Sequence, residues 1–114
     1  MVERRAVPRV EPKQSLDAEV MMNQPARILD ISSRGAQIEV ASSLPPSGPC
    51  DLRIRFANGH FAVHATVRRC HVSVVGAGAE DPPGMRFRAG LEFDEVDPES
   101  LARLTSNVLF HAQA

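Results

Sequence analysis

The chain has 114 residues, of which 43% are hydrophobic and 24% are charged, and its formal net charge at pH 7 is -1. This length suits one domain with a single core and leaves no room for two. The nearly neutral balance excludes a globally basic protein that coats nucleic acid.

The charges are unevenly distributed along the chain. Residues 1–13 carry four basic side chains against two acidic ones, whereas residues 80–99 carry seven acidic side chains against two arginines. A basic segment on a neutral to acidic body predicts a local site for an anion. No stretch approaches the roughly 18 apolar residues of a membrane-spanning helix, and the N-terminus lacks the apolar core of a secretory signal. We therefore expect a cytoplasmic protein with no membrane insertion.

Alternation of apolar and polar residues is the dominant pattern in the first part of the chain. With its period of two, it predicts half-buried strands over residues 15–22, 26–30 and 36–40. In the second of these, Asp30 is a candidate for the same face as Ala26 and Ile28. A loop is predicted over residues 44–49, because three prolines and a glycine there are incompatible with a strand or helix interior.

The dipeptide Asn58-Gly59 predicts a hairpin with a two-residue type I′ turn, whose two central positions both need positive φ. Centring the hairpin there pairs apolar residues only: Phe56 with Phe61, Ile54 with Val63, Leu52 with Ala65 and Cys50 with Val67. This agreement between turn and pattern indicates the register. In that register an uninterrupted strand places Cys70 on the opposite face from Cys50, so we expect two free thiols.

The last part of the chain changes period. Residues 76–84 are rich in glycine and proline and predict a second loop, and a further strand carries Phe87, Ala89, Leu91 and Phe93. A helix is then predicted over residues 97–111, with Asp97 as its N-cap and Pro98 in its first position. Six antiparallel strands and one helix predict a mainly all-β protein: a six-stranded antiparallel β-barrel with one C-terminal α-helix.

Motifs for catalysis and metal binding are missing from the sequence. It has no nucleophile elbow and no Walker loop, and its histidines, which lack metal-ligand spacing, are interpreted as surface or rim residues: His60, His64, His71 and His111. The carboxylates of residues 92–99 surround a strand end and a helix cap, which is typical of a solvated edge. We therefore expect no catalytic residue, no cofactor and no metal.

Two segments remain as candidates for ligand binding: Arg4-Arg5-Ala6-Val7-Pro8-Arg9 and Asp30-Ile31-Ser32-Ser33-Arg34-Gly35. Pro8 keeps the first segment out of helical conformation, and an extended backbone would separate Arg5 and Arg9 by about 13 Å. In the second, Asp and Ser side chains can close a turn and glycine can supply a left-handed position. Each segment alone is more simply explained by structure, the first as a solvated terminus and the second as a tight turn.

Together the two segments resemble the signature of the PilZ domain family. That signature is RxxxR near the N-terminus, here Arg5 to Arg9, followed about one strand later by Asp or Asn and then xSxxG, here residues 30–35. Residues 89–93, Ala-Gly-Leu-Glu-Phe, resemble the family's last strand, so the resemblance covers nearly the whole chain. It implies a six-stranded barrel with a C-terminal helix and a receptor for cyclic di-GMP (c-di-GMP), a bacterial second messenger.

The resemblance also implies one PilZ-like domain over residues 1–114. Within it we expect a flexible, arginine-containing arm over residues 1–14, the barrel over residues 15–94 and the helix over residues 97–111.

The chemistry of c-di-GMP explains what the matching residues would do. Its guanines offer N7 and O6 to arginine forks and its phosphates carry negative charge, so the resemblance assigns Arg5 and Arg9 to these groups. Arginine planes can also stack on the bases. The other implied site residues are Asp30 as acceptor for the guanine N1 and N2 donors, Ser32 as a hydroxyl, Gly35 to keep the turn open, and Arg4 and Arg34 as auxiliaries.

Three hypotheses about function follow. The first is a c-di-GMP sensor that orders its arginine arm on binding and signals through an unidentified effector protein, because a chain of this length has no attached enzyme. The second is a PilZ-like protein-interaction adaptor that binds no nucleotide, although the family members without ligand binding typically lose one of the two motifs. The third is an RNA-binding barrel, which the acidic segment and the scarcity of aromatic rings oppose, so we expect no DNA or RNA partner. The sequence leaves open whether the site holds one nucleotide or a stacked pair, and it does not fix the downstream process or the oligomeric state.

Overall fold

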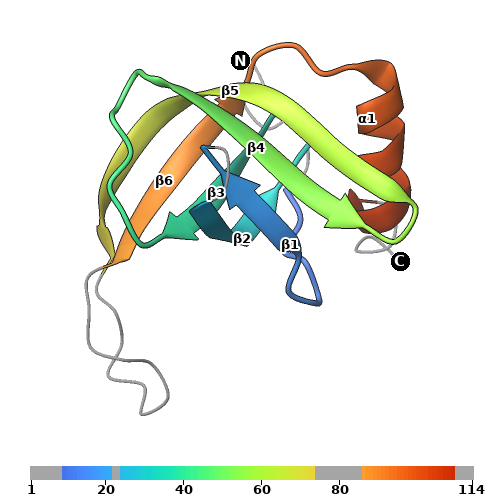
Figure 1. Ribbon diagram of the computed structural model, residues 1–114, viewed down its shortest axis with the longest axis horizontal. Helices are drawn as coiled ribbons and strands as arrows, with labels where there is room; N and C mark the ends of the chain where they lie inside the picture. The colour runs from blue at the N-terminus through green and yellow to red at the C-terminus, as the bar shows by residue number, and fades with distance from the viewer. Residues whose placement is uncertain (1–8, 22–23, 74–85, 110–114) are drawn as a thin grey trace, which may run out of the picture.

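The computed structural model describes residues 9–21, 24–73 and 86–109. In these residues six strands precede a helix (Figure 1): β1 (Asp17–Val20), β2 (Gln24–Ile31), β3 (Gly35–Val40), β4 (Pro49–Phe56), β5 (Gly59–Ser73) and β6 (Arg86–Phe93). Every neighbouring pair is antiparallel, and the strands close into a barrel in the order β1-β2-β3-β6-β5-β4. The predicted fold class is confirmed.

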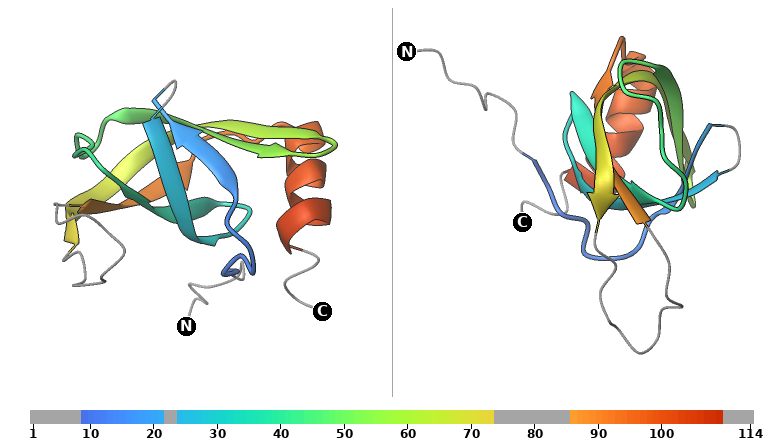
Figure 2. Two further views of the ribbon diagram at one scale, coloured as in Figure 1. Left: turned by 60° about the horizontal axis from the view of Figure 1, so that its bottom comes forward. Right: turned by 90° about the vertical axis from the view of Figure 1, so that its left-hand side faces the viewer.

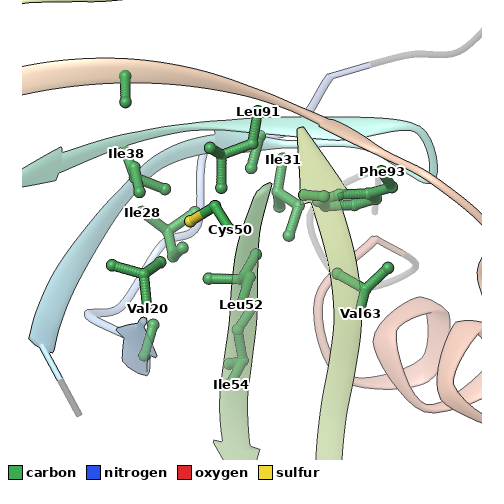
Figure 3. Close-up of a cluster of buried hydrophobic side chains, with 14 of the residues drawn as sticks. Val20, Ile28, Ile31, Ile38, Cys50, Leu52, Ile54, Val63, Leu91 and Phe93 are labelled. Carbon is green, nitrogen blue, oxygen red and sulfur yellow. The ribbon is translucent and has the colours of Figure 1, made fainter. Parts of the chain in front are cut away.

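Alternate residues of the strands point into the barrel and form one apolar core. Figure 3 shows how side chains from strands far apart in the chain converge in this interior, among them Val20, Ile38, Ile54 and Phe93. Successive side chains of a strand point to opposite faces of the sheet. The period-two alternation therefore predicted which residues are buried on most strands.

The hairpin of β4 and β5 is present, but its predicted register is wrong by two residues. The observed pairs are Phe56 with Gly59, Ile54 with Phe61, Leu52 with Val63 and Cys50 with Ala65. The turn residues are Ala57 and Asn58, and the positive φ of 138° lies at Gly59, after them, so the turn is not type I′. A shift of two residues keeps every side chain on its face of the sheet. The apolar residues of the predicted pairs are therefore still buried, except Phe56, which is partly buried.

A β-bulge interrupts the alternation of β2. The register with β3 shifts between Ile28 and Asp30, which makes Leu29 the extra residue. Beyond the bulge Ile31 takes the inward position and is fully buried. The expectation that Asp30 continues the inward face of Ile28 is therefore wrong, because the bulge turns its side chain to the outside.

A second bulge lies in β5. The register with β6 shifts between Val67 and Arg69, so Arg68 is the extra residue and Cys70 returns to the inward side, opposite Ala89. The expectation that Cys70 faces away from the side of Cys50 is wrong for this reason. Both cysteines are free, as predicted.

The helix begins as predicted. The Asp97 side chain accepts a hydrogen bond of 3.1 Å from the backbone N–H of Ser100, and α1 (Pro98–Leu104) continues into a π-helical turn, η1 (Thr105–Leu109). The predicted last residues, 110 and 111, lie outside the described part. Figure 2 shows α1 standing at the tip of the β4–β5 hairpin, where Arg103 Nη1 donates to the carbonyl of His60 across 2.8 Å. No helix in the described part of the chain is long and apolar enough to cross a bilayer.

Candidate functional site

Arg9, the last residue of the first candidate segment, meets the second candidate segment in space. Arg9 Nη1 donates to Asp30 Oδ1 across 2.8 Å, and the Arg9 and Asp30 side chains are 49% and 21% exposed. The neighbouring residues hold this pair in register, because Val10 and Ile31 exchange two backbone hydrogen bonds of 2.8 and 2.9 Å. Val10 is itself buried, at 6% exposure. Residues 9 and 10 are thus anchored to β2 beside Asp30.

The turn between β2 and β3 is closed from within by Ser32. Its Oγ accepts hydrogen bonds from the backbone N–H groups of Arg34, at 3.1 Å, and Gly35, at 3.2 Å. Ser32 is buried, with 3% exposure, and its hydroxyl forms hydrogen bonds within the turn. Arg34 projects outward from the same turn and is exposed.

Gly35 serves the packing of the barrel. A Cβ built at this position would overlap the carbonyl oxygen of Leu91 on β6, because β3 and β6 run in close contact here. Its φ does not lie in the left-handed region, so the expectation of a left-handed glycine is wrong. Glycine is required at this position by close approach of two backbones.

A groove of about 520 Å³ runs along the outer face of β3, β6 and β5, next to the turn. Its wall carries five arginines and one histidine: Arg9, Arg34, Arg68, Arg69, Arg88 and His71. Among the described residues that line the groove, Glu92 is the single carboxylate, and it pairs with Arg68. We call this hollow the arginine groove. Its charge suits a compact ligand with more than one negative group.

The β5 bulge adds to this charge. Because Arg68 is the extra residue, Arg68 and Arg69 are adjacent in sequence and both exposed beside the groove. Cross-strand pairing places Arg69 opposite Gly90, and His71 opposite Arg88. Sequence reasoning missed Arg68, Arg69 and Arg88 as site residues and interpreted His71 as a rim residue. The dipeptide Arg68-Arg69, at the point where the alternation of the strand breaks, is the signal that could have found the first two.

A second hollow, of about 790 Å³, lies on the other side of the Arg9–Asp30 pair. Asp30 lines this hollow, Arg9 lines the arginine groove, and Gln37 and Arg88 line both. Its wall mixes basic and acidic side chains, among them Lys13, Arg27 and Arg86 with Glu11 and Glu39. The arginine groove is therefore the better match for an anion.

Two titratable groups with shifted pKa values lie away from the arginine groove. Burial, with a smaller contribution from Asp51, raises the pKa of the Cys50 thiol to about 11. On the outer face of β4 and β5, His64 Nδ1 lies 2.5 Å from Asp51 Oδ1, and this hydrogen bond raises the pKa of His64. Neither group contributes to the proposed ligand chemistry.

The structure brings together five of the predicted site residues around the turn and the groove: Arg9, Asp30, Ser32, Arg34 and Gly35. Arg4 and Arg5 lie outside the described residues.

A family model of the PilZ domain matches residues 3–110. The chain belongs to the PilZ domain family. PilZ domains are receptors for c-di-GMP and are generally not catalysts.

Solved structures with the same fold include another PilZ domain and two longer proteins. The PilZ domain of YcgR from Escherichia coli with c-di-GMP has a TM-score of 0.71 at 16% identity, over 97% of this chain and 92% of that one. The inhibitor of motility MotI (DgrA) from Bacillus subtilis has a TM-score of 0.68 at 19% identity, over 96% of this chain and 51% of that one. The complex of K. pneumonia MrkH with c-di-GMP has a TM-score of 0.64 at 15% identity, over 93% of this chain and 51% of that one. This PilZ domain thus spans about half the length of MotI and MrkH, and no curated protein matches it.

Proposed function

We propose that this PilZ domain is a c-di-GMP receptor that binds its ligand in the arginine groove, with Arg9 and Asp30 as principal contacts. The observation that carries the proposal is that Arg9, which pairs with Asp30, lines a groove whose described residues include five arginines and one carboxylate. Two of the structures with the same fold, the YcgR domain and MrkH, hold c-di-GMP. That likeness supports the choice of ligand.

The groove matches the ligand's functional groups. Phosphates favour charge-assisted hydrogen bonds from arginine, and the N7 and O6 edge of guanine accepts a bidentate arginine fork. Arg9 and Arg34 stand at one side of the groove, and Arg69 and Arg88 come from the strands that form its floor. We assign phosphate and guanine contacts to these four side chains.

Asp30 supplies the complementary acceptor. Guanine N1 and N2 are donors, which an ionised carboxylate accepts well. In the structure Asp30 already accepts from Arg9, so the ligand must share or replace this hydrogen bond. An ion pair as exposed as this one contributes only about 0–1 kcal/mol. Replacing it therefore costs little beside the charged hydrogen bonds that the nucleotide would form with both residues.

The proposal includes an arm that responds to the ligand. Arg4 and Arg5 are assigned to the bound nucleotide, so that the segment preceding Arg9 orders over the groove when c-di-GMP binds. A newly ordered segment presents a new surface, which an effector protein would recognise. We place the protein in the cytoplasm, a location that two free cysteines favour.

Isothermal titration calorimetry of the full chain with c-di-GMP tests the proposal. We expect saturable binding, with a stoichiometry of one or two nucleotides for each domain, that weakens as NaCl is raised because charged contacts are screened. GTP serves as the control ligand. A flat titration at micromolar protein would overturn the proposal and favour the adaptor that binds no nucleotide.

A further inference from the structure

Gly90 occupies the middle of the arginine groove. It lies on β6, the central strand of the three that form the groove floor, and it pairs with Gln37 of β3 on one side and Arg69 of β5 on the other. Its neighbours Ala89 and Leu91 are buried, so a side chain at Gly90 would point outward into the groove.

The fold does not require glycine at this position. A Cβ built on Gly90 would have as its nearest neighbour the Cγ of Arg69, at 3.4 Å, which is an ordinary contact with a flexible side chain. Its φ lies outside the left-handed region. Gly35, two residues along β3 from the partner Gln37, differs because a Cβ there would overlap a backbone carbonyl. Glycine inside a strand weakens the strand, and it often marks a place where a ligand approaches the backbone closely.

The side chains around Gly90 indicate which chemical group of a ligand could lie against its backbone. On one side lies the cross-strand row of Glu39, Arg88 and His71, and Arg69 stands directly opposite on β5. Neighbouring strands are about 4.8 Å apart, so the floor from β3 across β6 to β5 is roughly 10 Å wide. Gly90 is thus a single position without a side chain beside guanidinium groups. Such a position suits one planar, electron-rich ring, because arginine can stack on such a ring or bind its edge.

We propose that Gly90 is a specificity-determining residue for the ligand's base: its bare backbone seats one purine ring of the cyclic dinucleotide flat on β6, between Arg69 and Arg88. This inference rests on the proposed function, because it concerns the same ligand in the same groove. The missing side chain is the determinant, since any Cβ would stand where the ring lies. The outward α-hydrogen of Gly90 contacts the ring face.

Substitution of Gly90 in the full chain tests the inference. The variants are Gly90→Ala and Gly90→Val, and the matched control is Ala62→Val, which adds bulk at a half-buried β5 position outside the groove. We expect Gly90→Ala to keep the wild-type melting profile and to bind c-di-GMP at least about tenfold more weakly, as overfilled sites do. Gly90→Val should bind more weakly still, and Ala62→Val should bind like the wild type.

The position of the base is measured separately. An NOE between the Gly90 α-hydrogens and guanine H8 in the wild-type complex is expected, and a merely structural role for Gly90 would not produce it. The inference is overturned if Gly90→Ala binds c-di-GMP with wild-type affinity, or if this variant loses the melting transition of the native fold. In either case the proposed function stands as long as the wild-type protein binds c-di-GMP. Absence of binding by the wild type overturns the proposed function, and the inference with it.

Discussion

Arg9 and Asp30 are 21 positions apart in the chain, and their side chains meet across 2.8 Å on the outside of the barrel. Two local features produce this contact. The bridge between Val10 and Ile31 fixes the approach of the N-terminal segment, and the β2 bulge at Leu29 turns Asp30 outward. Arg9, from the first half of the PilZ signature, and Asp30, from the second half, therefore lie together in the structure.

Arg9→Ala is predicted to abolish c-di-GMP binding with little effect on folding. The truncation removes a charged ligand contact, a loss of roughly 2–5 kcal/mol of binding free energy. The Arg9 side chain is 49% exposed, and an exposed ion pair contributes only about 0–1 kcal/mol to stability. Calorimetry measures the binding and a thermal melt measures the folding. Binding at wild-type strength would show that Arg9 is not a ligand contact.

Exchange of the two charges distinguishes the role of Arg9 and Asp30 in their ion pair from their role in ligand binding. In the double variant Arg9→Asp with Asp30→Arg, the pair can form again with reversed polarity, so we expect the melting temperature to stay near that of the wild type. Binding should not return, because the acceptor and the donor now face the wrong groups of the nucleotide. Recovery of c-di-GMP affinity in the double variant would assign the pair to scaffolding alone.

Ser32→Ala is predicted to destabilise the protein as well as the site. The buried Ser32 hydroxyl accepts hydrogen bonds from two backbone N–H groups of its own turn. Leaving such N–H groups without a partner costs about 1–3 kcal/mol of folding free energy. Urea unfolding measures the loss, with the neighbouring half-buried Ser33→Ala as control. Equal stabilities of the two variants would contradict the assignment of Ser32 to the turn.

Gly35→Ala is predicted to lower the melting temperature. Its Cβ would overlap the Leu91 carbonyl oxygen, so β3 and β6 must separate locally, and overpacking of this kind costs about 1–3 kcal/mol. Gly90→Ala is the comparison, because its Cβ finds room beside Arg69. Differential scanning calorimetry should rank Gly35→Ala clearly below Gly90→Ala, and the reverse order would be incompatible with the described packing.

His64 is predicted to titrate above its ordinary pKa of 6.5, because Asp51 accepts a hydrogen bond from its ring and stabilises the protonated form. The folded state therefore gains stability from protonated His64 below about the ordinary pKa. This gain is lost as the pH rises through the raised value. NMR titration of the His64 ring measures the pKa. Asp51→Asn should lower it toward 6.5, and an unchanged value would contradict the pairing.

Much of the barrel could be predicted from the sequence, because alternation reports the face of each strand residue directly. The hairpin at Asn58 shows the limit. Turn preference and an apolar ladder both tolerate a register shifted by two residues, since such a shift buries the same side chains. The two bulges were not predicted, and they decide where Asp30 and Cys70 point.

The sequence predicted the candidate site only in part. Arg9, Asp30 and Ser32 were found through a motif, which fixes identities and spacing along the chain. Arg69 and Arg88 belong to different strands and join the groove only through the β5–β6 register. The break in alternation at Arg68-Arg69 marks one of these two strands, but nothing local in the sequence distinguishes Arg88 from an ordinary solvated arginine.

A map of backbone amide shifts during titration of the isotopically labelled full chain with c-di-GMP tests whether the nucleotide binds in the arginine groove. We expect the largest changes on Arg9, Asp30, Arg34, Arg69 and Gly90, and no changes in residues of β1 and of the outer face of β4. Changes confined to β1 and β4, or no changes at saturating ligand, would contradict binding of c-di-GMP in the arginine groove.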